Sequence, residues 1–244
     1  MRYFIEFAYK GTNYHGWQMQ PDAISVQEVL TKATNIILKD SFELVGAGRT
    51  DAGVHAAQMY AHFDTETVFD AQEIVRKLNS FLPEDIAVFS IFEVNHEAHT
   101  RFDATARTYE YHIHLKKNVF SKDLSWYHYR KLNIDKMNEA AKILLEYEDF
   151  ECFSKTHTDV FTFNCTITEA FWQLKGDNLI FTISANRFLR NMVRAIVGTL
   201  INIGLEKIKV EEMRNIIESK NRGKAGFSVP AHGLYLTKVT YPYI

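Results

Sequence analysis

A carboxylate and a guanidinium stand two residues apart in residues 48–56, which read GRTDAGVHA. Asp51 supplies the carboxylate and Arg49 the guanidinium. Gly48 and Gly53 flank them, and glycine both adopts backbone angles that other residues rarely adopt and lets a ligand approach closely. A carboxylate held in such a frame can act as a nucleophile or as a general base.

Two strand-like segments bracket this glycine-rich stretch. Residues 42–47 read as one strand, and residues 57–63 alternate between polar and apolar side chains as a second strand would. The pattern predicts a turn at the edge of a sheet. Two interpretations of Asp51 stay open: it caps its own backbone in a hairpin, as aspartate often does in turns, or it projects into a ligand site.

A carboxylate in a partly buried site needs a cation beside it to stay ionised. Arg49 and Arg194 are both candidates for that cation. Residues 187–203 have the periodicity of a helix, on which Arg190 and Arg194 are four residues apart and share a face. The alternative for this pair is a solvated basic stripe on a helix surface.

Tyr109 lies in a predicted strand over residues 104–115, on the same side as Tyr111 and Ile113. Most aromatic residues in such positions belong to a core. A tyrosine that lines a pocket can instead stack on a nucleobase taken out of its helix. An aspartate, arginines and an aromatic residue together suggest chemistry on a nucleic acid.

The charge of the chain is unevenly distributed. The net charge is −2, which by itself does not indicate a protein that binds polyanions. Residues 187–224, however, hold nine Lys or Arg against four Glu, a local balance of +5 that leaves −7 for the rest of the chain. This basic segment either contacts phosphates or serves only to keep helix surfaces solvated.

Composition predicts a soluble globular protein of a reducing compartment, the cytoplasm. The chain has 244 residues and 46% hydrophobic content, enough for a substantial core. Its two cysteines, Cys152 and Cys165, make no disulfide framework, and we expect buried thiols. The most apolar segment, residues 192–205, is too short to cross a bilayer, and residues 1–7 alternate like a strand and do not resemble a signal peptide.

The order of the predicted elements repeats along the chain. The first half reads strand, helix, strand, strand, helix, strand, over residues 2–9, 25–38, 42–47, 57–63, 70–82 and 86–94. The second half repeats this order with one extra helix, over residues 104–115, 135–147, 166–174, 179–184, 187–203, 210–219 and 234–241. We therefore expect an α+β fold of two ferredoxin-like β-α-β-β-α-β halves, residues 1–99 and 100–244, forming a mostly antiparallel sheet with helices on one face. Loops of both halves would meet in a cleft that brings Asp51 to the basic segment.

Other chemistries find little support in the sequence. His112 and His114 point to one face of a predicted strand. Zinc needs three or four ligands, however, and no further His or Cys stands at a sequence spacing typical of zinc sites. The Gly-x-Ser-x-Gly elbow of serine hydrolases and the glycine-rich nucleotide signatures do not occur. We expect no metal and no cofactor.

Five ordered segments resemble the tRNA pseudouridine synthase A family, and the similarity covers nearly the whole chain. The segments are residues 9–20 (YKGTNYHGWQMQ), 48–56 (GRTDAGVHA), 101–111 (RFDATARTYEY), 186–198 (NRFLRNMVRAIVG) and 230–236 (PAHGLYL). The resemblance implies a cofactor-independent isomerase that converts uridine to pseudouridine at positions 38 to 40 in the anticodon arm of tRNA. It also implies a homodimer whose cleft binds RNA, with tRNA contacting both subunits.

The same resemblance implies a role for each candidate residue. Asp51 would be the catalytic aspartate and Arg194 its ion-pair partner. Arg49 would displace or hold the flipped nucleotide, and Tyr109 would pack on the target base. Arg190 stands where the family often has an uncharged residue or histidine, and would add a phosphate contact.

Some questions stay open at the level of sequence. Asp51 either attacks the nucleotide covalently or acts as a base on the ribose to give a glycal intermediate. Lys10 stands where many members of the family have an acid, and Cys165 stands where a basic residue is common; both lie outside the Asp51 motif and concern substrate contacts, not the reaction. A structured-RNA-binding protein without catalytic activity, and a metal-dependent hydrolase that uses His112 and His114, are the alternative functions.

Overall fold

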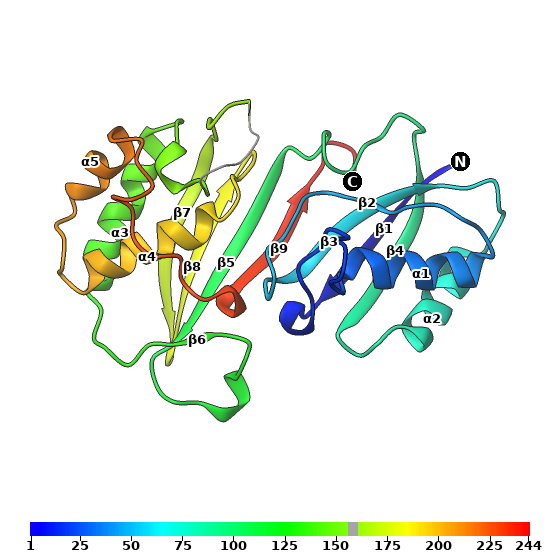
Figure 1. The fold of residues 1–244 in the computed structure, drawn as a ribbon, viewed down its shortest axis with the longest axis horizontal. Helices are drawn as coiled ribbons and strands as arrows, with labels where there is room; N and C mark the ends of the chain where they lie inside the picture. Colours follow the sequence, from blue (N-terminus) through cyan, green and yellow to red (C-terminus); the bar gives the residue numbers. More distant parts are fainter. Residues whose placement is uncertain (156–160) are drawn as a thin grey trace. The chain divides into compact units, whose positions relative to one another are not determined.

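A computed structural model describes residues 1–155 and 161–244 of the chain. The chain divides into two compact units (Figure 1). Unit 1 consists of Met1–Thr105 and Leu236–Ile244, and unit 2 consists of Ala106–Tyr235. The C-terminal residues therefore return to the unit that contains the N-terminus.

Unit 1 has the element order predicted for the first half of the chain. Its elements are β1 (Arg2–Tyr9), α1 (Val26–Leu38), β2 (Val45–Gly46), β3 (His55–Asp64), α2 (Ala71–Phe81) and β4 (Ile86–Val94), with a 3₁₀ turn, η1 (Gly11–Asn13), after β1. The strands lie in the order β4-β1-β3, and β9 (Leu234–Thr240) follows β3. β1 is antiparallel to β3 and β4, and the two-residue β2, shorter than predicted, is antiparallel to β3.

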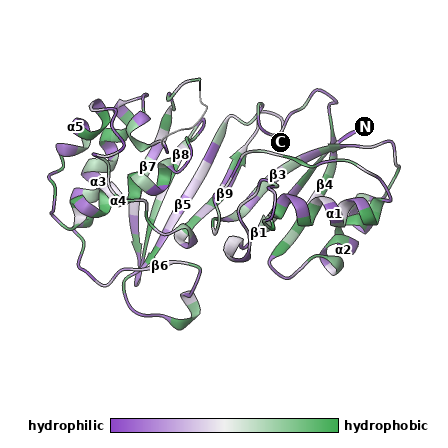
Figure 2. Cartoon of the chain, viewed as in Figure 1, coloured by the Kyte–Doolittle hydropathy of each residue, from purple (hydrophilic) through white to green (hydrophobic). Residues whose placement is uncertain are grey.

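Local sequence explains where the helices of unit 1 begin. The Ser25 hydroxyl accepts a hydrogen bond from Glu28 N at 3.2 Å, as the predicted capping box requires. The Asp70 carboxylate accepts from the first turn of α2 in the same way. Figure 2 shows hydrophobic and hydrophilic residues interspersed along α1 and α2, as expected for helices with one buried face.

Unit 2 is also mostly antiparallel. Its elements are β5 (Ala106–His114), β6 (Trp126–Tyr127), α3 (Ile134–Ile143), β7 (Ile167–Lys175), β8 (Asn178–Ala185), α4 (Met192–Gly204) and α5 (Glu212–Glu218). Short 3₁₀ turns are η2 (Val119–Ser121), η3 (Leu144–Glu146), η4 (Glu151–Phe153) and η5 (Ala231–Gly233). β5 and β7 flank β8 with antiparallel pairing, whereas the short β6 is parallel to β5. The described residues thus form an α+β protein with mostly antiparallel strands, as predicted.

The helix predicted over residues 187–203 begins later than the periodicity suggested. α4 starts at Met192, and the preceding Asn191 has φ +66°, a left-handed conformation that interrupts any helix. Most of α4 is buried, and the segment after residue 224 packs closely on it: a Cβ built on Gly198 would lie 1.8 Å from Phe227 O. Gly226 N donates to Thr199 Oγ1 at 2.8 Å, which ties that segment to the helix.

Both cysteines are buried free thiols, as predicted. Burial raises the pKa of Cys152 to about 12 and that of Cys165 to about 11. Thiols with such pKa values are poor nucleophiles at neutral pH, because little thiolate is present. Within the described residues, no helix combines the length and the apolar character needed to cross a membrane.

Candidate functional site

Asp51 lies in the connection between β2 and β3, residues 47–54, which we call the Asp51 loop. The Asp51 side chain is half-buried and Arg49 is exposed. The backbone turns at Asp51 itself, because Val54 N donates to Asp51 O at 3.1 Å. Gly53 has φ +77°, so glycine is needed at this position. Gly48 does not adopt a positive φ, so the backbone freedom of glycine is not needed there, and a Cβ built on it would meet open space.

A second loop, residues 10–18, holds the Asp51 loop in place, and we call it the supporting loop. Thr50, next to Asp51, joins the two: its Oγ1 accepts from Trp17 N at 3.1 Å and lies 2.8 Å from the Tyr9 hydroxyl oxygen. Gly53 N donates to Tyr14 O at 3.3 Å on the other side of Asp51. The backbone on both sides of the carboxylate is therefore fixed by hydrogen bonds.

The two loops approach so closely that side chains would not fit between them. A Cβ built on Gly16, which has φ +87°, would lie 2.2 Å from Thr50 O. A Cβ built on Gly11 would lie 1.9 Å from Val54 O. Both distances are far below van der Waals contact, so glycine is required at both positions. The sequence motifs include these glycines, but nothing in their local pattern indicates a contact with residues 34 and 43 positions later.

The supporting loop is itself anchored to Asp85, just before β4. The Tyr14 hydroxyl donates to Asp85 Oδ1 at 2.5 Å, and Asn13 Nδ2 donates to Asp85 Oδ2 at 3.0 Å. Lys10 N donates to Asp85 O at 2.8 Å. Burial, and then the hydrogen bond to Asp85, raise the pKa of Tyr14. Tyr14 therefore stays protonated and able to donate at any physiological pH.

Trp17 packs against the strands that lead into the two loops. Its ring is 2% exposed and stacks on Phe7 of β1 with ring centroids 5.2 Å apart. A Cβ on Gly46 of β2 would lie 2.4 Å from Trp17 Nε1, so the indole packs directly on the backbone that leads into the Asp51 loop. Asp51 thus belongs to a rigid part of unit 1, and loops of this kind commonly carry function.

Tyr109 lies on β5 in unit 2, opposite Ile183 of β8. Its half-buried ring meets Phe188 edge-on, with centroids 5.1 Å apart. Tyr111, two residues further along β5, is buried and donates its hydroxyl hydrogen to Pro230 O at 2.8 Å. Tyr111 is thus a core residue, whereas Tyr109 keeps part of its ring accessible.

Arg194 occupies the first turn of α4 and is half-buried. Its Nε donates to Val229 O at 2.7 Å, and Val229 N donates back to Arg194 O at 3.3 Å. The first bond uses one of the five guanidinium N–H groups and so fixes the orientation of the whole side chain. Burial raises the pKa of Tyr111, and the nearby positive charge of Arg194 partly offsets this rise.

Arg190 lies outside the helix that carries Arg194. It is an exposed residue of the turn before α4, and its carbonyl accepts from Lys155 N at 3.0 Å. The prediction that Arg190 and Arg194 share a helix face was therefore wrong. The five predicted residues fall into two sets: Arg49 and Asp51 in unit 1, and Tyr109, Arg190 and Arg194 in unit 2. The predicted pairing of Asp51 with Arg194 joins the two units and stays a prediction.

The two histidines considered as metal ligands have other contacts. His112 Nε2 lies 2.7 Å from Glu110 Oε2, and His114 Nδ1 lies 2.6 Å from Ser125 Oγ. In the described part of the chain, no three or more His, Cys, Asp or Glu residues are grouped so that they could hold a metal ion.

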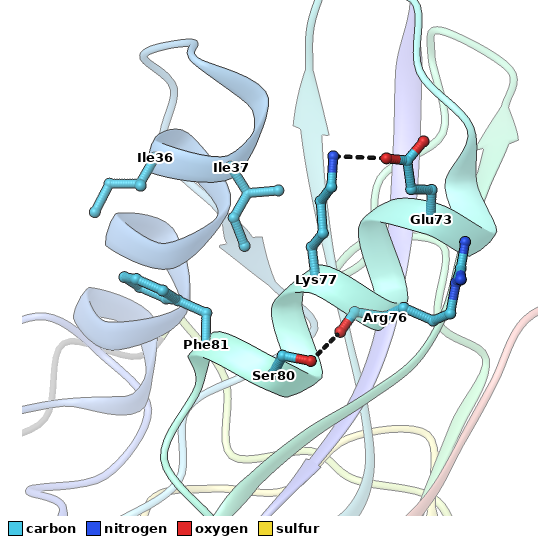
Figure 3. A pocket seen from close by; sticks show the side chains of 7 residues that line it. All are labelled: Ile36, Ile37, Glu73, Arg76, Lys77, Ser80 and Phe81. Atoms are coloured by element: carbon cyan, nitrogen blue, oxygen red, sulfur yellow. Dashed lines mark hydrogen bonds and ion pairs between the residues drawn. The ribbon is translucent and has the colours of Figure 1, made fainter.

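An open groove of about 560 Å³ lies between α1 and α2 (Figure 3) and contains none of the predicted site residues. Ile36 and Ile37 of α1 and Phe81 of α2 line it, and an ion pair of 2.7 Å joins Glu73 to Lys77 on α2. The groove lies on the helical side of unit 1.

Known proteins resemble the chain over nearly its full length. A family model described as tRNA pseudouridine synthase matches residues 6–103 and 140–242, and this match places the chain among isomerases. The tRNA pseudouridine synthase A of Bacteroides thetaiotaomicron is 52% identical over 244 residues, covering 99% of this chain and 91% of that protein. The protein of the same name from Thermoanaerobacter pseudethanolicus is 42% identical, covering 97% of this chain and 98% of its own length. The chain belongs to the tRNA pseudouridine synthase A family.

Proposed function

We propose that the protein isomerises uridine to pseudouridine in tRNA, at positions 38 to 40 of the anticodon stem-loop, with Asp51 as the catalytic residue. The observation that supports this most strongly is the fixed backbone around Asp51. Hydrogen bonds hold Thr50 and Gly53 on either side of it, within a segment that the family model matches. A reactive carboxylate needs such preorganisation, because its geometry must be set before the substrate arrives.

The reaction itself explains which groups the protein must supply. The bond from uracil N1 to ribose C1′ breaks, the uracil turns within the site, and a bond from C5 to C1′ forms. C5 loses its proton to solvent and N1 gains one, so the product is an isomer of the substrate. Asp51 either attacks covalently or acts as a base on the ribose, and both routes need an ionised carboxylate.

The other predicted residues have complementary roles in this proposal. Arg194 pairs with Asp51 and keeps it ionised, since a guanidinium at contact distance favours the charged form. Tyr109 packs on the target base with the accessible part of its ring. Arg49 and Arg190, which are both exposed, contact the flipped nucleotide and a phosphate respectively. Extruding the uridine costs a few kcal/mol, which stacking and phosphate contacts offset.

We further propose that residues 1–99 and 100–244 are two ferredoxin-like halves of one catalytic unit. The β-α-β-β-α-β order of unit 1 supports this. The protein would act as a homodimer that binds tRNA from both subunits, in the cytoplasm, where two free thiols suit a reducing environment. Local basic patches, such as residues 187–224, would bind the polyanion despite the net charge of −2.

A tritium-release assay tests the proposed activity. Transfer RNA labelled with tritium at uracil C5 loses the label when C5 bonds to ribose, so the wild-type protein should release tritium from tRNA that carries uridine at positions 38 to 40. Substrates with cytidine at these positions are the matched control and should release none. If tRNAs with anticodon-arm uridines release no label, the proposed function is wrong.

A further inference from the structure

The segment after β5 exposes an unusual number of aromatic side chains, and we call residues 116–131 the aromatic loop. It extends beyond the end of β5 and includes β6 (Figure 1). Phe120 is 88% exposed, Tyr129 is 70% exposed and Tyr127 is 43% exposed. Exposed aromatic clusters of this kind are uncommon on a surface that binds nothing.

The strand geometry of the loop separates its buried rings from its exposed rings. Trp126 and Tyr127 pair in parallel with Ile113 and His114 of β5, and His128 N continues this pairing by donating to His114 O at 3.0 Å. Side chains alternate along such a segment. Trp126 and His128 therefore face inward and contact each other, with ring centroids 4.9 Å apart. The side chains of Tyr127 and Tyr129 lie on the opposite, outward side of the segment.

The outward side chains form a continuous row. Tyr127 stacks on His114 with centroids 5.2 Å apart, and the Tyr129 ring follows at 6.4 Å from Tyr127. The Arg130 guanidinium carbon lies 5.8 Å from the Tyr129 ring centroid. The row thus presents two tyrosine rings and a guanidinium next to one another, and the bases of single-stranded nucleic acids stack on such groups.

The charge of the loop favours a polyanion. It contains five basic residues and one acidic residue, although the whole chain has a net charge of −2. The six are Lys116, Lys117, Lys122, Asp123, Arg130 and Lys131. Lys116 pairs with Asp177 at 3.0 Å, whereas Lys117, Lys122, Arg130 and Lys131 form no ion pair within the described part of the chain.

We propose that the aromatic loop is a second tRNA-binding surface, on which tyrosine rings stack on unpaired bases and the lysines contact phosphates. Stacking on aromatic side chains next to a basic track is how proteins bind single-stranded nucleic acid. The proposal rests on the proposed function in one respect, because it takes tRNA to be the substrate.

The surface is separate from the nucleotide that reacts. Tyr127 pairs with His114, which is five residues along β5 from Tyr109. At about 3.3 Å per residue, the two positions are about 17 Å apart along the strand. One nucleotide cannot occupy both, so the aromatic loop binds a different part of the tRNA and contributes to affinity.

Two double variants of the full-length protein test the surface. Tyr127→Ala/Tyr129→Ala removes both rings, and we expect the Kd for tRNA and the KM to rise at least about thirtyfold while kcat falls less than twofold. Tyr127→Phe/Tyr129→Phe keeps the rings and should restore most of the affinity. Phe81→Ala is the matched control, because Phe81 is a 56% exposed aromatic residue of α2 in unit 1. It should bind tRNA as the wild type does.

A charge variant gives an independent readout that does not depend on the rings. Lys117→Ala/Lys122→Ala should make the slope of log Kd against log salt shallower by about 0.7 to 0.9 for each phosphate that the lysines no longer neutralise. Kd values of the tyrosine-to-alanine and lysine variants within twofold of wild type, with an unchanged salt slope, would overturn the proposal. A lowered kcat at unchanged KM would also overturn it. Kd is measured without turnover. These binding measurements therefore test the proposed surface separately, even if the tritium-release assay shows that the proposed function is wrong.

Discussion

At the residue scale, the environment of Asp51 is more constrained than its sequence pattern indicated. The glycine-rich stretch was compatible with a simple capped hairpin. In the structure Thr50 Oγ1 accepts a hydrogen bond from Trp17 N, and Gly53 N donates one to Tyr14 O, so the supporting loop also holds the Asp51 loop in place. These contacts join residues far apart in sequence. Local pattern indicates which residue types are present, but not which distant backbone group each one meets.

A second residue-scale feature predicts how stability depends on pH. His62 on β3 is 5% exposed, and its Nδ1 lies 2.9 Å from Thr100 Oγ1. Burial, and then the nearby positive groups of His99 and Arg2, lower the pKa of His62 to about 4. In the unfolded chain the His62 imidazole takes up a proton as the pH falls below about 6.5. In the folded protein it takes up this proton only as the pH approaches about 4.

The free energy of unfolding should therefore fall as the pH is lowered between these two values, with up to about 3 kcal/mol lost through His62. Urea unfolding at about pH 7 and about pH 5 measures this loss. His62→Gln should lose less stability over this range than the wild type. His96→Gln, which changes an exposed histidine, should lose as much as the wild type. Equal losses in all three proteins would contradict the assignment.

At the element scale, periodicity predicted most helices and strands but misplaced the start of α4. Leu189 is buried just as a helical residue at that spacing would be, so the apolar pattern continues upstream of the helix. The left-handed Asn191 breaks the helix all the same. The spacing of hydrophobic residues indicates which side chains are buried, but not the backbone angles. For this reason Arg190 was wrongly placed on the same helix face as Arg194. Capping residues gave better boundaries, as Ser25 and Asp70 did.

The contact between the supporting loop and the Asp51 loop leads to an element-scale prediction. Gly16→Ala places a Cβ 2.2 Å from Thr50 O and forces a side chain into a conformation with φ +87°. The loops must separate, so we expect a loss of at least about 2 kcal/mol in the free energy of unfolding, measured by urea denaturation. Gly48→Ala is the matched control, since a Cβ there meets open space, and should change stability by less than about 0.5 kcal/mol. Equal effects of the two substitutions would contradict the description of the contact.

At the scale of the whole molecule, the predicted site draws on both units. Unit 1 supplies Asp51 and Arg49, and unit 2 supplies Tyr109, Arg190 and Arg194. The resemblance of the sequence motifs to the family predicts a role for all five, although they lie far apart along the chain. It gave no information on how each residue is held. The bond from Arg194 to Val229 O and the contact of Tyr109 with Phe188 emerge only from the fold.

The central claim is that the Asp51 carboxylate performs the isomerisation. The most direct test measures tritium release from C5-labelled tRNA by Asp51→Ala, in single turnover with enzyme in excess, next to the Kd of the variant for tRNA. Asp51 is half-buried in a loop that other residues hold in place, so the variant should fold and bind tRNA. It should release no tritium above background. Release at a rate near that of the wild type would contradict the role assigned to Asp51.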